Sequence, residues 1–326
     1  MQREKMEYDV VIVGAGPAGL STAIRLRQLA IENNLELTVC VLEKGSEVGA
    51  HILSGAVFEP RALNELIPNW KAKQAPLETA VSTDEVYFLK NPDKAYKVPN
   101  VFVPKPMHNK GNYIVSLGNV CRWLAAQAEE LDVDIFPGFP AADVIIDETN
   151  IVRGVITSDM GIATDGSQKD SFEPGMELIS KYTIFAEGCR GHLGKRLTEH
   201  FKLDDKSDPQ HYGLGIKELW EIPEAQHKPG LVIHGAGWPL NESDSSGGFF
   251  LYHMENNQVS VGLITDLNYS NPYVSPYQEF QRLKHHPQIK QYLKEGRRVS
   301  YGARAITKGG DFSLPKMVMP GAIMVG

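Results

Sequence analysis

The order of apolar and polar residues predicts a strand, a helix and a second strand at the start of the chain. Residues 9–13 (DVVIV) are an unbroken run rich in β-branched side chains, typical of a strand buried on both faces. From residue 14 the apolar positions repeat with the period of a helix, whose inner face is expected to hold Leu20, Ala23, Ile24 and Leu26. Residues 35–44 (LELTVCVLEK) indicate a second strand, which completes a β-α-β unit.

The middle of the chain predicts short strands between two further helices. The second half of residues 49–70 is expected to be helical, with Leu63, Leu66, Ile67 and Trp70 on one face. Strand-like pieces are expected at 86–89 and 101–104, a helix at 118–133, a β-meander over 133–168 that turns at Asp165-Gly166, and a buried strand at 181–188.

The last third alternates apolar and polar residues as half-buried strands do. Strands are expected at residues 213–220, 247–254 and 258–265, followed by a polar helix that carries Tyr277, Phe280 and Tyr292. Residues 320–326 (PGAIMVG) indicate another strand, at which the sequence stops. Since a buried strand with nothing after it is a poor terminus, we expect the sequence to be a fragment of a longer protein.

Composition and charge narrow the class of protein. At about 150 residues per domain, 326 residues predict two domains. Apolar residues make up 42% and charged residues 22%, which is ordinary for a globular chain with a proper core and excludes disorder as its main state. The net charge of −7 is spread along the chain and predicts no binding to nucleic acid.

The cysteines and the N-terminus indicate a soluble protein of a reducing compartment. Cys40, Cys121 and Cys189 lie far apart and form no C-x-x-C pair, so we expect no metal ligands in this chain. A sparse, odd number of cysteines also disfavours a secreted disulfide framework. The chain enters its first strand too early for a signal or transit peptide, and no apolar run reaches the length of about 18 residues that spans a membrane.

The loop between the first strand and helix carries a glycine fingerprint for a dinucleotide. Gly14, Gly16 and Gly19 form G-x-G-x-x-G directly after a strand and at the start of a helix, and Glu43 closes the second strand. The helix N-terminus would hold a pyrophosphate, and Glu43 would accept hydrogen bonds from the ribose hydroxyl groups. An acidic side chain at this place disfavours the 2′-phosphate of NADP. The expected cofactor-binding set is Val13, Gly14, Ala15, Gly16, Pro17, Ala18, Gly19, Glu43 and Lys44. The alternative is a glycine-rich turn without a ligand.

The fingerprint alone does not separate FAD from NAD. Its position at the N-terminus, followed by residues 182–191 (YTIFAEGCRG), is similar to the layout of flavoproteins with two dinucleotide domains. In that layout a later strand that ends in glycine approaches the flavin side of the cofactor, which adds Gly188 to the expected FAD site. The alternative for Gly188 is a plain strand-to-helix turn.

Several collinear segments together resemble the electron transfer flavoprotein–ubiquinone oxidoreductase family. They are GAHILSGAVFEP, GNYIVSLGNVCRWL, TIFAEGCRGHLGK, YGLGIKELW, GWPL, NPYVSPYQEFQRLKHHP and YGARAI, and the resemblance runs from about residue 8 to Gly326. It implies an enzyme, electron-transferring-flavoprotein dehydrogenase, with FAD and a 4Fe–4S cluster. It also implies that electrons pass from reduced electron transfer flavoprotein through these centres to ubiquinone.

The resemblance also implies where ubiquinone and the membrane are met. Gly247 and Gly248 match the glycines of the family's quinone site, although a strand bulge is the alternative for such a pair. The range Gly49–Trp70 matches a membrane-dipping stretch, where an ordinary core helix is the alternative. Lys105 and Lys110 could flank it near lipid phosphates. The implied location is peripheral, on the cytoplasmic face of a bacterial inner membrane.

The sequence departs from the family at its end. The family's cluster-binding cysteines come later than Gly326, and none of the three cysteines present can replace them, so we expect the iron–sulfur domain to be absent from this chain. We name no catalytic residue, because the flavin would carry the electrons. Six histidines could be proton relays but are more often surface or hydrogen-bonded residues: His51, His108, His192, His211, His234 and His253, of which His253 deserves the first test.

Two other functions stay open. An aromatic-ring monooxygenase of the same superfamily would usually carry Asp-Gly where this chain has Glu187-Gly188. A non-catalytic FAD- or quinone-binding module is the other.

The expected fold is α/β, a Rossmann-like FAD-binding domain with an inserted, mostly antiparallel α+β quinone-binding domain. The FAD-binding domain is expected at 1–75, 110–210 and 301–326, and the quinone-binding domain at 76–109 and 211–300.

Overall fold

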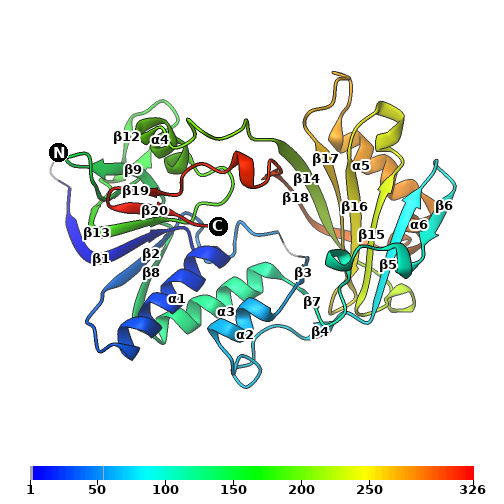
Figure 1. Cartoon of the computed structure of the whole chain (residues 1–326), viewed down its shortest axis with the longest axis horizontal. Helices are drawn as coiled ribbons and strands as arrows, with labels where there is room; N and C mark the ends of the chain where they lie inside the picture. Colours follow the sequence, from blue (N-terminus) through cyan, green and yellow to red (C-terminus); the bar gives the residue numbers. More distant parts are fainter. Residues whose placement is uncertain (1–2, 54) are drawn as a thin grey trace. The chain divides into compact units, whose positions relative to one another are not determined.

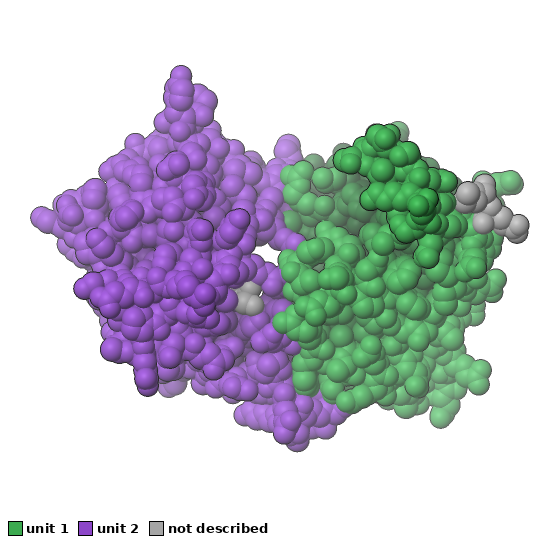
Figure 2. Space-filling model, turned by 180° about the vertical axis from the view of Figure 1, so that it is seen from behind, with its two compact units in different colours: residues 1–51, 121–208, 311–326 green, residues 52–120, 209–310 purple. Residues whose placement is uncertain are grey.

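A computed structural model describes residues 3–53 and 55–326 of the chain. The chain divides into two compact units, each made of separate stretches of sequence. Unit 1 holds residues 1–51, 121–208 and 311–326, and unit 2 holds residues 52–120 and 209–310 (Figure 2). Each unit has its own sheet and its own core and is described by itself.

Unit 1 is an α/β layer structure built on a parallel sheet. Its elements are β1 (Lys5–Val13), α1 (Pro17–Glu32), β2 (Val39–Glu43), α3 (Leu117–Glu129, whose first turn falls in unit 2), β8 (Val133–Pro137), β9 (Ala141–Ile146), β10 (Val152–Thr157), β11 (Met160–Ile162), β12 (Gln168–Glu173), β13 (Glu177–Phe185), α4 (His192–Phe201), the 3-10 turn η5 (Asp311–Ser313), β19 (Val318–Met319) and β20 (Ala322–Met324).

The central strands of unit 1 lie in the order β20-β13-β1-β2-β8 and are all parallel, with β10, β9 and β19 added antiparallel (Figure 1). Side chains of the central strands alternate between two buried faces, which explains their continuous apolar runs. On β1, Val11 and Val13 pack with Leu193 and Leu197 of α4, while Ile12 points to the opposite face of the sheet. The carboxyl ends of β1, β2 and β13 therefore meet at one edge.

Unit 2 is built on a larger and mostly antiparallel sheet. Its elements are β3 (Ala56–Phe58), α2 (Arg61–Leu66), β4 (Thr79–Ala80), β5 (Thr83–Leu89), β6 (Ala95–Val98), η1 (Asn100–Phe102), η2 (Lys105–Met107), β7 (Tyr113–Val115), β14 (Tyr212–Glu221), η3 (Glu224–Gln226), β15 (Leu231–Gly237), η4 (Leu240–Ser243), β16 (Gly247–His253), β17 (Gln258–Asp266), α5 (Pro276–His285), α6 (Pro287–Leu293) and β18 (Arg297–Thr307).

The main sheet of unit 2 has seven strands in the order β18-β14-β17-β16-β15-β5-β6, of which only β15 and β5 pair in parallel. Helices α5 and α6 cover one face, where Phe280 and Tyr292 pack into the main core (Figure 1). On the other face the small sheet β3-β7-β4 contributes Ile114 to a second cluster with Tyr252. The α/β architecture with a mostly antiparallel second unit agrees with the fold expected from the sequence.

Four expectations about single elements were wrong. Residues 101–104 form no strand, because prolines at 99 and 104 favour short 3-10 turns in place of sheet pairing. Residues 133–137 form β8, which pairs with β2 in the parallel sheet and not with the meander. The expected helix with Leu63 ends at Leu66, before Pro68. The single polar helix is two helices, because Pro287 ends α5.

The unit boundaries differ from the domain boundaries expected from the sequence. Residues 209–210 and 301–310, assigned above to the FAD-binding domain, lie in unit 2, where β18 pairs with β14. Residues 52–75 and 110–120, also assigned above to the FAD-binding domain, lie in unit 2 as well. They do so because β3 and β7 pair with each other, and because the backbone of Gly55 lies against Ser260 of β17.

Candidate functional site: a glycine loop in unit 1 and a glycine pair in unit 2

The loop that follows strand β1 depends on its first glycine. Gly14 has a φ of +106°, a backbone conformation that other residues rarely adopt. A Cβ atom built on Gly14 lies 2.4 Å from the carbonyl oxygen of Ala186, so the loop after β1 touches the loop after β13. Glycine is therefore required here by the fold, whether or not a ligand binds.

Gly16 and Gly19 have different surroundings at the start of helix α1. A Cβ atom on Gly19 lies 2.0 Å from the carbonyl oxygen of Gly14, so Gly19 lets the helix pack closely on the loop. Around Gly16, apart from its chain neighbours, no described atom lies within 4 Å of such a Cβ. Gly16 is also the N-cap of α1, and no side chain of the described residues caps the helix there. Open space in front of uncapped N–H groups suits an anionic group such as pyrophosphate.

Glu43 ends strand β2 with its carboxylate against the glycine loop. One carboxylate oxygen accepts a hydrogen bond from the N–H of Ala15 (3.1 Å), and the other accepts one from the N–H of Gly45 (2.7 Å). Each oxygen has a further lone pair for a ribose hydroxyl group. Lys44, the next residue, is exposed.

The loop after β13 brings Gly188 to the same edge of the sheet. Gly188 has a φ of +72°, and apart from its chain neighbours no described atom lies within 4 Å of a Cβ atom built on it. The carboxylate of the preceding Glu187 accepts a hydrogen bond from the N–H of Gly194 (2.8 Å) and so caps helix α4. The sequence reasoning missed this role, since a carboxylate seven residues before the bonded N–H follows no usual capping pattern.

The expected cofactor-binding residues thus gather in unit 1. Val13 to Gly19, Glu43 and Gly188 lie at the carboxyl ends of three neighbouring parallel strands, β1, β2 and β13. In open α/β sheets this is the edge at which dinucleotides bind. The open position at Gly16 and the oriented carboxylate of Glu43 fit the pyrophosphate and the ribose of a dinucleotide.

Gly247 and Gly248 begin strand β16 in unit 2. Gly247 has a φ of +154°, and a Cβ atom built on it lies 2.0 Å from the carbonyl oxygen of Ile264. A Cβ atom on Gly248 lies 2.9 Å from the carbonyl oxygen of Gly235. Neighbouring strands thus explain why neither residue carries a side chain, and a quinone at this pair remains a prediction.

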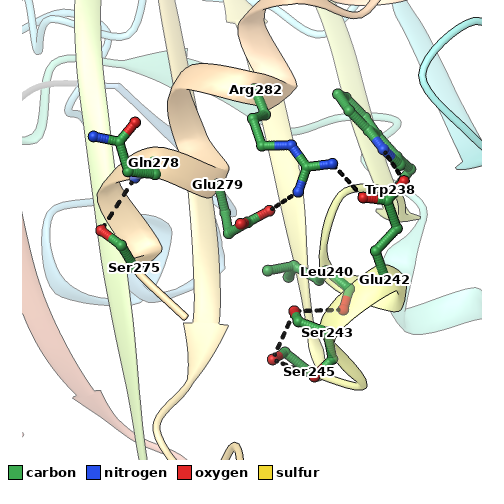
Figure 3. Close-up of polar contacts among 9 residues, drawn as sticks. All are labelled: Trp238, Leu240, Glu242, Ser243, Ser245, Ser275, Gln278, Glu279 and Arg282. Atoms are coloured by element: carbon green, nitrogen blue, oxygen red, sulfur yellow. Dashed lines mark hydrogen bonds and ion pairs between the residues drawn. The ribbon is translucent and has the colours of Figure 1, made fainter. Parts of the chain in front are cut away.

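The turn before Gly247 is tied to helix α5 by Arg282 (Figure 3). The guanidinium group of Arg282 donates hydrogen bonds to Glu242 and to Glu279 (2.9 Å) and lies over the ring of Trp238 at 5.1 Å. The indole N–H of Trp238 donates to Glu242 as well (2.9 Å). Hydrogen bonding to Arg282 holds the pKa of Glu242 below its ordinary value.

The same turn positions Gly247 by packing. The Cδ1 atom of Leu240 lies 2.6 Å from a Cβ built on Gly247, so the leucine covers the glycine. The hydroxyl group of Ser243 donates to the carbonyl oxygen of Leu240 (3.1 Å), and Ser243 and Ser245 share a further hydrogen bond (3.2 Å). The glycine pair is therefore held by a network that the sequence reasoning did not foresee.

His253, the histidine singled out from the sequence, is fully buried in the sheet of unit 2. Its Nδ1 accepts a hydrogen bond from the N–H of Lys228 (3.1 Å), and its ring meets the ring of Tyr292 edge to face at 4.9 Å. Burial, with His227 and Lys228 as further causes, lowers the pKa of His253 to about 3. The imidazole therefore stays neutral near pH 7.

The described residues offer no cluster of metal ligands. Cys40 and Cys121 are buried and Cys189 is exposed, and none of the three forms a disulfide within the described residues. Within residues 3–53 and 55–326, no three His, Cys, Asp or Glu side chains gather as a metal site. These residues do not fit a 4Fe–4S cluster, which needs four thiolate ligands. Over the same residues, no helix has the length and apolar character needed to span a membrane.

The fold and the site together define the class of protein. It has a Rossmann-type flavoprotein fold in one unit and a mostly antiparallel sheet in the other. Residues 12–72 match a family model described as an NAD(P)-binding Rossmann-like domain, and residues 212–306 match one described as ETF-QO, ubiquinone-binding. The whole chain is 64% identical to the electron transfer flavoprotein-ubiquinone oxidoreductase of Pseudomonas aeruginosa and 49% identical to the mitochondrial protein of Homo sapiens. Along its entire length the chain is similar to proteins named electron transfer flavoprotein-ubiquinone oxidoreductase. It spans 59% and 53% of the length of these two relatives.

Solved structures share the fold at low identity. A geranylgeranyl bacteriochlorophyll reductase-like protein from Thermoplasma acidophilum matches with a TM-score of 0.70 and 18% identity, covering 99% of this chain and 71% of that chain. Aklavinone-11 hydroxylase, solved with FAD and aklavinone, matches with a TM-score of 0.63 and 14% identity, covering 100% of this chain and 57% of that chain. At these identities the likeness extends to the fold alone.

Proposed function

We propose that the chain is the FAD- and ubiquinone-binding part of an enzyme that passes electrons from reduced electron transfer flavoprotein to ubiquinone. The observation that carries this proposal is the sequence identity of 64% over the entire chain to a relative named for that reaction. The proposal assigns FAD to unit 1 and ubiquinone to unit 2.

For FAD, the support comes from the glycine loop. A bound flavin supplies the electron-carrying chemistry, and the protein binds and orients it. Gly16 leaves room for the pyrophosphate at the N-terminus of α1, and Glu43 accepts hydrogen bonds from the adenosine ribose. Val13, Ala15, Pro17, Ala18 and Lys44 line the same loop and strand end, and Gly188 lies on the flavin side.

For ubiquinone, the support is the family model over residues 212–306, which includes all of β16 and β17. Gly247 and Gly248 lie in this range, at the start of β16. We assign the quinone head group to this pair. We derive no electron-transfer step through an iron–sulfur cluster, because the cysteines present do not fit one.

A membrane surface is the third proposed partner, at the cytoplasmic face of a bacterial inner membrane. The range Gly49–Trp70 was expected to reach it, but Leu63, Ile67 and Trp70 are buried in unit 2, and Ser54 is outside the described residues. Val101 and Phe102 are 84% and 75% exposed, close in sequence to Lys105 and Lys110. Exposed apolar side chains beside lysines suit a lipid surface with anionic head groups, so we infer that residues 101–110 make the stronger contact.

The proposal is tested first by its cofactor. The purified chain, titrated with FAD, should bind one FAD, and an excess of NAD should not displace it. NADH or NADPH should not bleach the bound flavin rapidly, whereas rapid bleaching would favour the monooxygenase. A flavin that dithionite reduces but electron transfer flavoprotein does not would fit the non-catalytic module. Failure to bind FAD would overturn the proposal.

A further inference from the structure

Lys217 and Glu218 are neighbours on strand β14, and their charges meet very different surroundings. Glu218 points to the helix side of the sheet, is 2% exposed, and pairs with Lys284 (2.8 Å) and Arg298 (3.0 Å). Lys217 points to the opposite face, because side chains alternate along a strand. One residue is thus paired twice, and the other is not paired with a carboxylate.

Within the described part of the chain, the ammonium group of Lys217 forms one hydrogen bond, which is long. It donates to the carbonyl oxygen of Gly55 over 3.4 Å, and no carboxylate of the described residues forms an ion pair with it. Burial first, and then the guanidinium group of Arg304, two residues along on the neighbouring strand β18, together lower the pKa of Lys217 to about 8. A partly desolvated cation without a counter-charge is costly to the fold, which points to a use in binding.

On both strands next to Lys217, the residue in register with it is a glycine. Lys217 lies between Gly262 on β17 and Gly302 on β18 in the strand register. The ring of Phe250 lies over Gly262, and Leu53 lies over Gly302, so the lysine stem runs between two apolar groups. The amine is therefore fixed in direction by its neighbours.

Gly248, one of the two glycines assigned to the quinone, lies on the same face. Gly248 is two residues from Phe250 along β16, and Phe250 is in register with Gly262, the strand partner of Lys217. From strand spacing and rise, the Cα atoms of Gly248 and Lys217 are about 12 Å apart. The side chains of Phe250 and Ile264 stand on this face between the two residues. A quinone head group, a flat ring with oxygen atoms at opposite ends, would therefore contact both Gly248 and Lys217 by lying over these two apolar side chains.

We propose that Lys217 is the charged hydrogen-bond donor of the quinone site, and that its ammonium group binds a carbonyl oxygen of the quinone head group. The inference rests on the proposed function of unit 2 and adds a residue to it. It explains why a cation is placed on a glycine-rich sheet face without a carboxylate. Hydrogen bonds from charged donors are roughly twice as strong as neutral ones, so Lys217 would add affinity for the quinone carbonyl oxygen.

The test compares binding with stability in the same variants. Lys217→Met keeps the length of the side chain and removes its charge, Lys217→Arg keeps a charge, and Lys290→Met on the exposed side of α6 is the matched control. Each variant is measured for its dissociation constant with a short-chain ubiquinone by equilibrium dialysis, and for its midpoint of thermal unfolding.

We expect Lys217→Met to weaken quinone binding about ten-fold or more without lowering the unfolding midpoint, because a desolvated unpaired charge is removed. Lys217→Arg should retain much of the affinity, and Lys290→Met should change neither quantity.

Quinone binding by Lys217→Met within two-fold of the unchanged chain would overturn the inference while leaving the quinone site in place. A lower unfolding midpoint with unchanged affinity would make Lys217 a structural residue. If the unchanged chain binds no quinone, the proposed function of unit 2 fails, and the inference fails with it.

Discussion

At the scale of single residues, unit 2 buries several charged and polar groups, and their surroundings decide what each one does. Glu218 has two cationic partners, whereas His253 is kept neutral by burial. Because the strand GLGIKELW is otherwise apolar, the sequence predicts that its two charged residues need partners. It does not predict which residues those partners are. Lys284 and Arg298 come from elements 66 and 80 residues later, so only the folded chain reveals the pairing.

Replacing Glu218 should destabilise unit 2 strongly. Glu218→Gln leaves Lys284, whose side chain is 13% exposed, without a counter-charge. We expect a loss of about 3 kcal/mol in the free energy of unfolding, measured by denaturant titration. The control on the same strand is Glu221→Gln, because Glu221 pairs with Arg297 at the exposed surface. Equal effects of the two substitutions would contradict this account of the buried pair.

His253 should not titrate between pH 5 and pH 8. Its pKa is lowered in the folded chain relative to the ordinary value of 6.5, so the folded state disfavours the proton. The stability that a neutral His253 contributes is complete above pH 6.5 and is lost as the pH falls toward 3, by at most about 1.4 kcal/mol per pH unit. Nuclear magnetic resonance of the histidine side chains checks this directly. A His253 midpoint near pH 6.5 would show that the ring is hydrated.

At the scale of elements, the strand-to-helix loop of unit 1 was well predicted, because its glycine spacing, its strand and its helix all lie within 45 residues. The prediction was weaker where partners come from distant sequence. The apolar stripe of Leu63, Ile67 and Trp70 has the same pattern for a core helix and for a lipid-facing one. Only the small sheet formed with β7 shows that it is turned inward.

Two glycines of the fingerprint should respond in opposite ways to alanine. In Gly14→Ala the new Cβ meets the Ala186 carbonyl and the φ is unfavourable, so we expect a lower unfolding midpoint. In Gly16→Ala the Cβ meets open space, so the midpoint should be unchanged while FAD affinity falls at least ten-fold. Both quantities come from thermal unfolding with and without FAD. Undiminished FAD affinity in Gly16→Ala would place the pyrophosphate elsewhere.

Membrane association should depend on residues 101–110. Phe102→Asp should reduce flotation of the chain with anionic liposomes, and charge reversal of Lys105 and Lys110 should reduce it further. Phe88→Asp, at a side chain 46% exposed on β5, is the matched control. Flotation that survives the Phe102 and lysine substitutions would exclude this segment as the contact.

At the scale of the whole molecule, the chain builds two units from five stretches of sequence, and this discontinuity limited what the sequence could predict. The Rossmann-like fold and the antiparallel second unit follow from hydrophobic periodicity and from the family resemblance. The boundaries near residues 52 and 120 do not, because they depend on β3 pairing with β7 and on Gly55 packing against Ser260. Such contacts between distant segments leave no local signal.

The central claim is that this chain holds a flavin whose electrons ubiquinone can take. The most direct measurement loads the chain with FAD, reduces it with dithionite without oxygen, and follows reoxidation of the flavin after mixing with short-chain ubiquinone. We predict that the flavin is reoxidised, at a rate that saturates as the quinone concentration rises. A flavin that stays reduced would contradict the claim. A reoxidation rate that rises in simple proportion to the quinone concentration would show that the chain has no saturable binding site for the quinone.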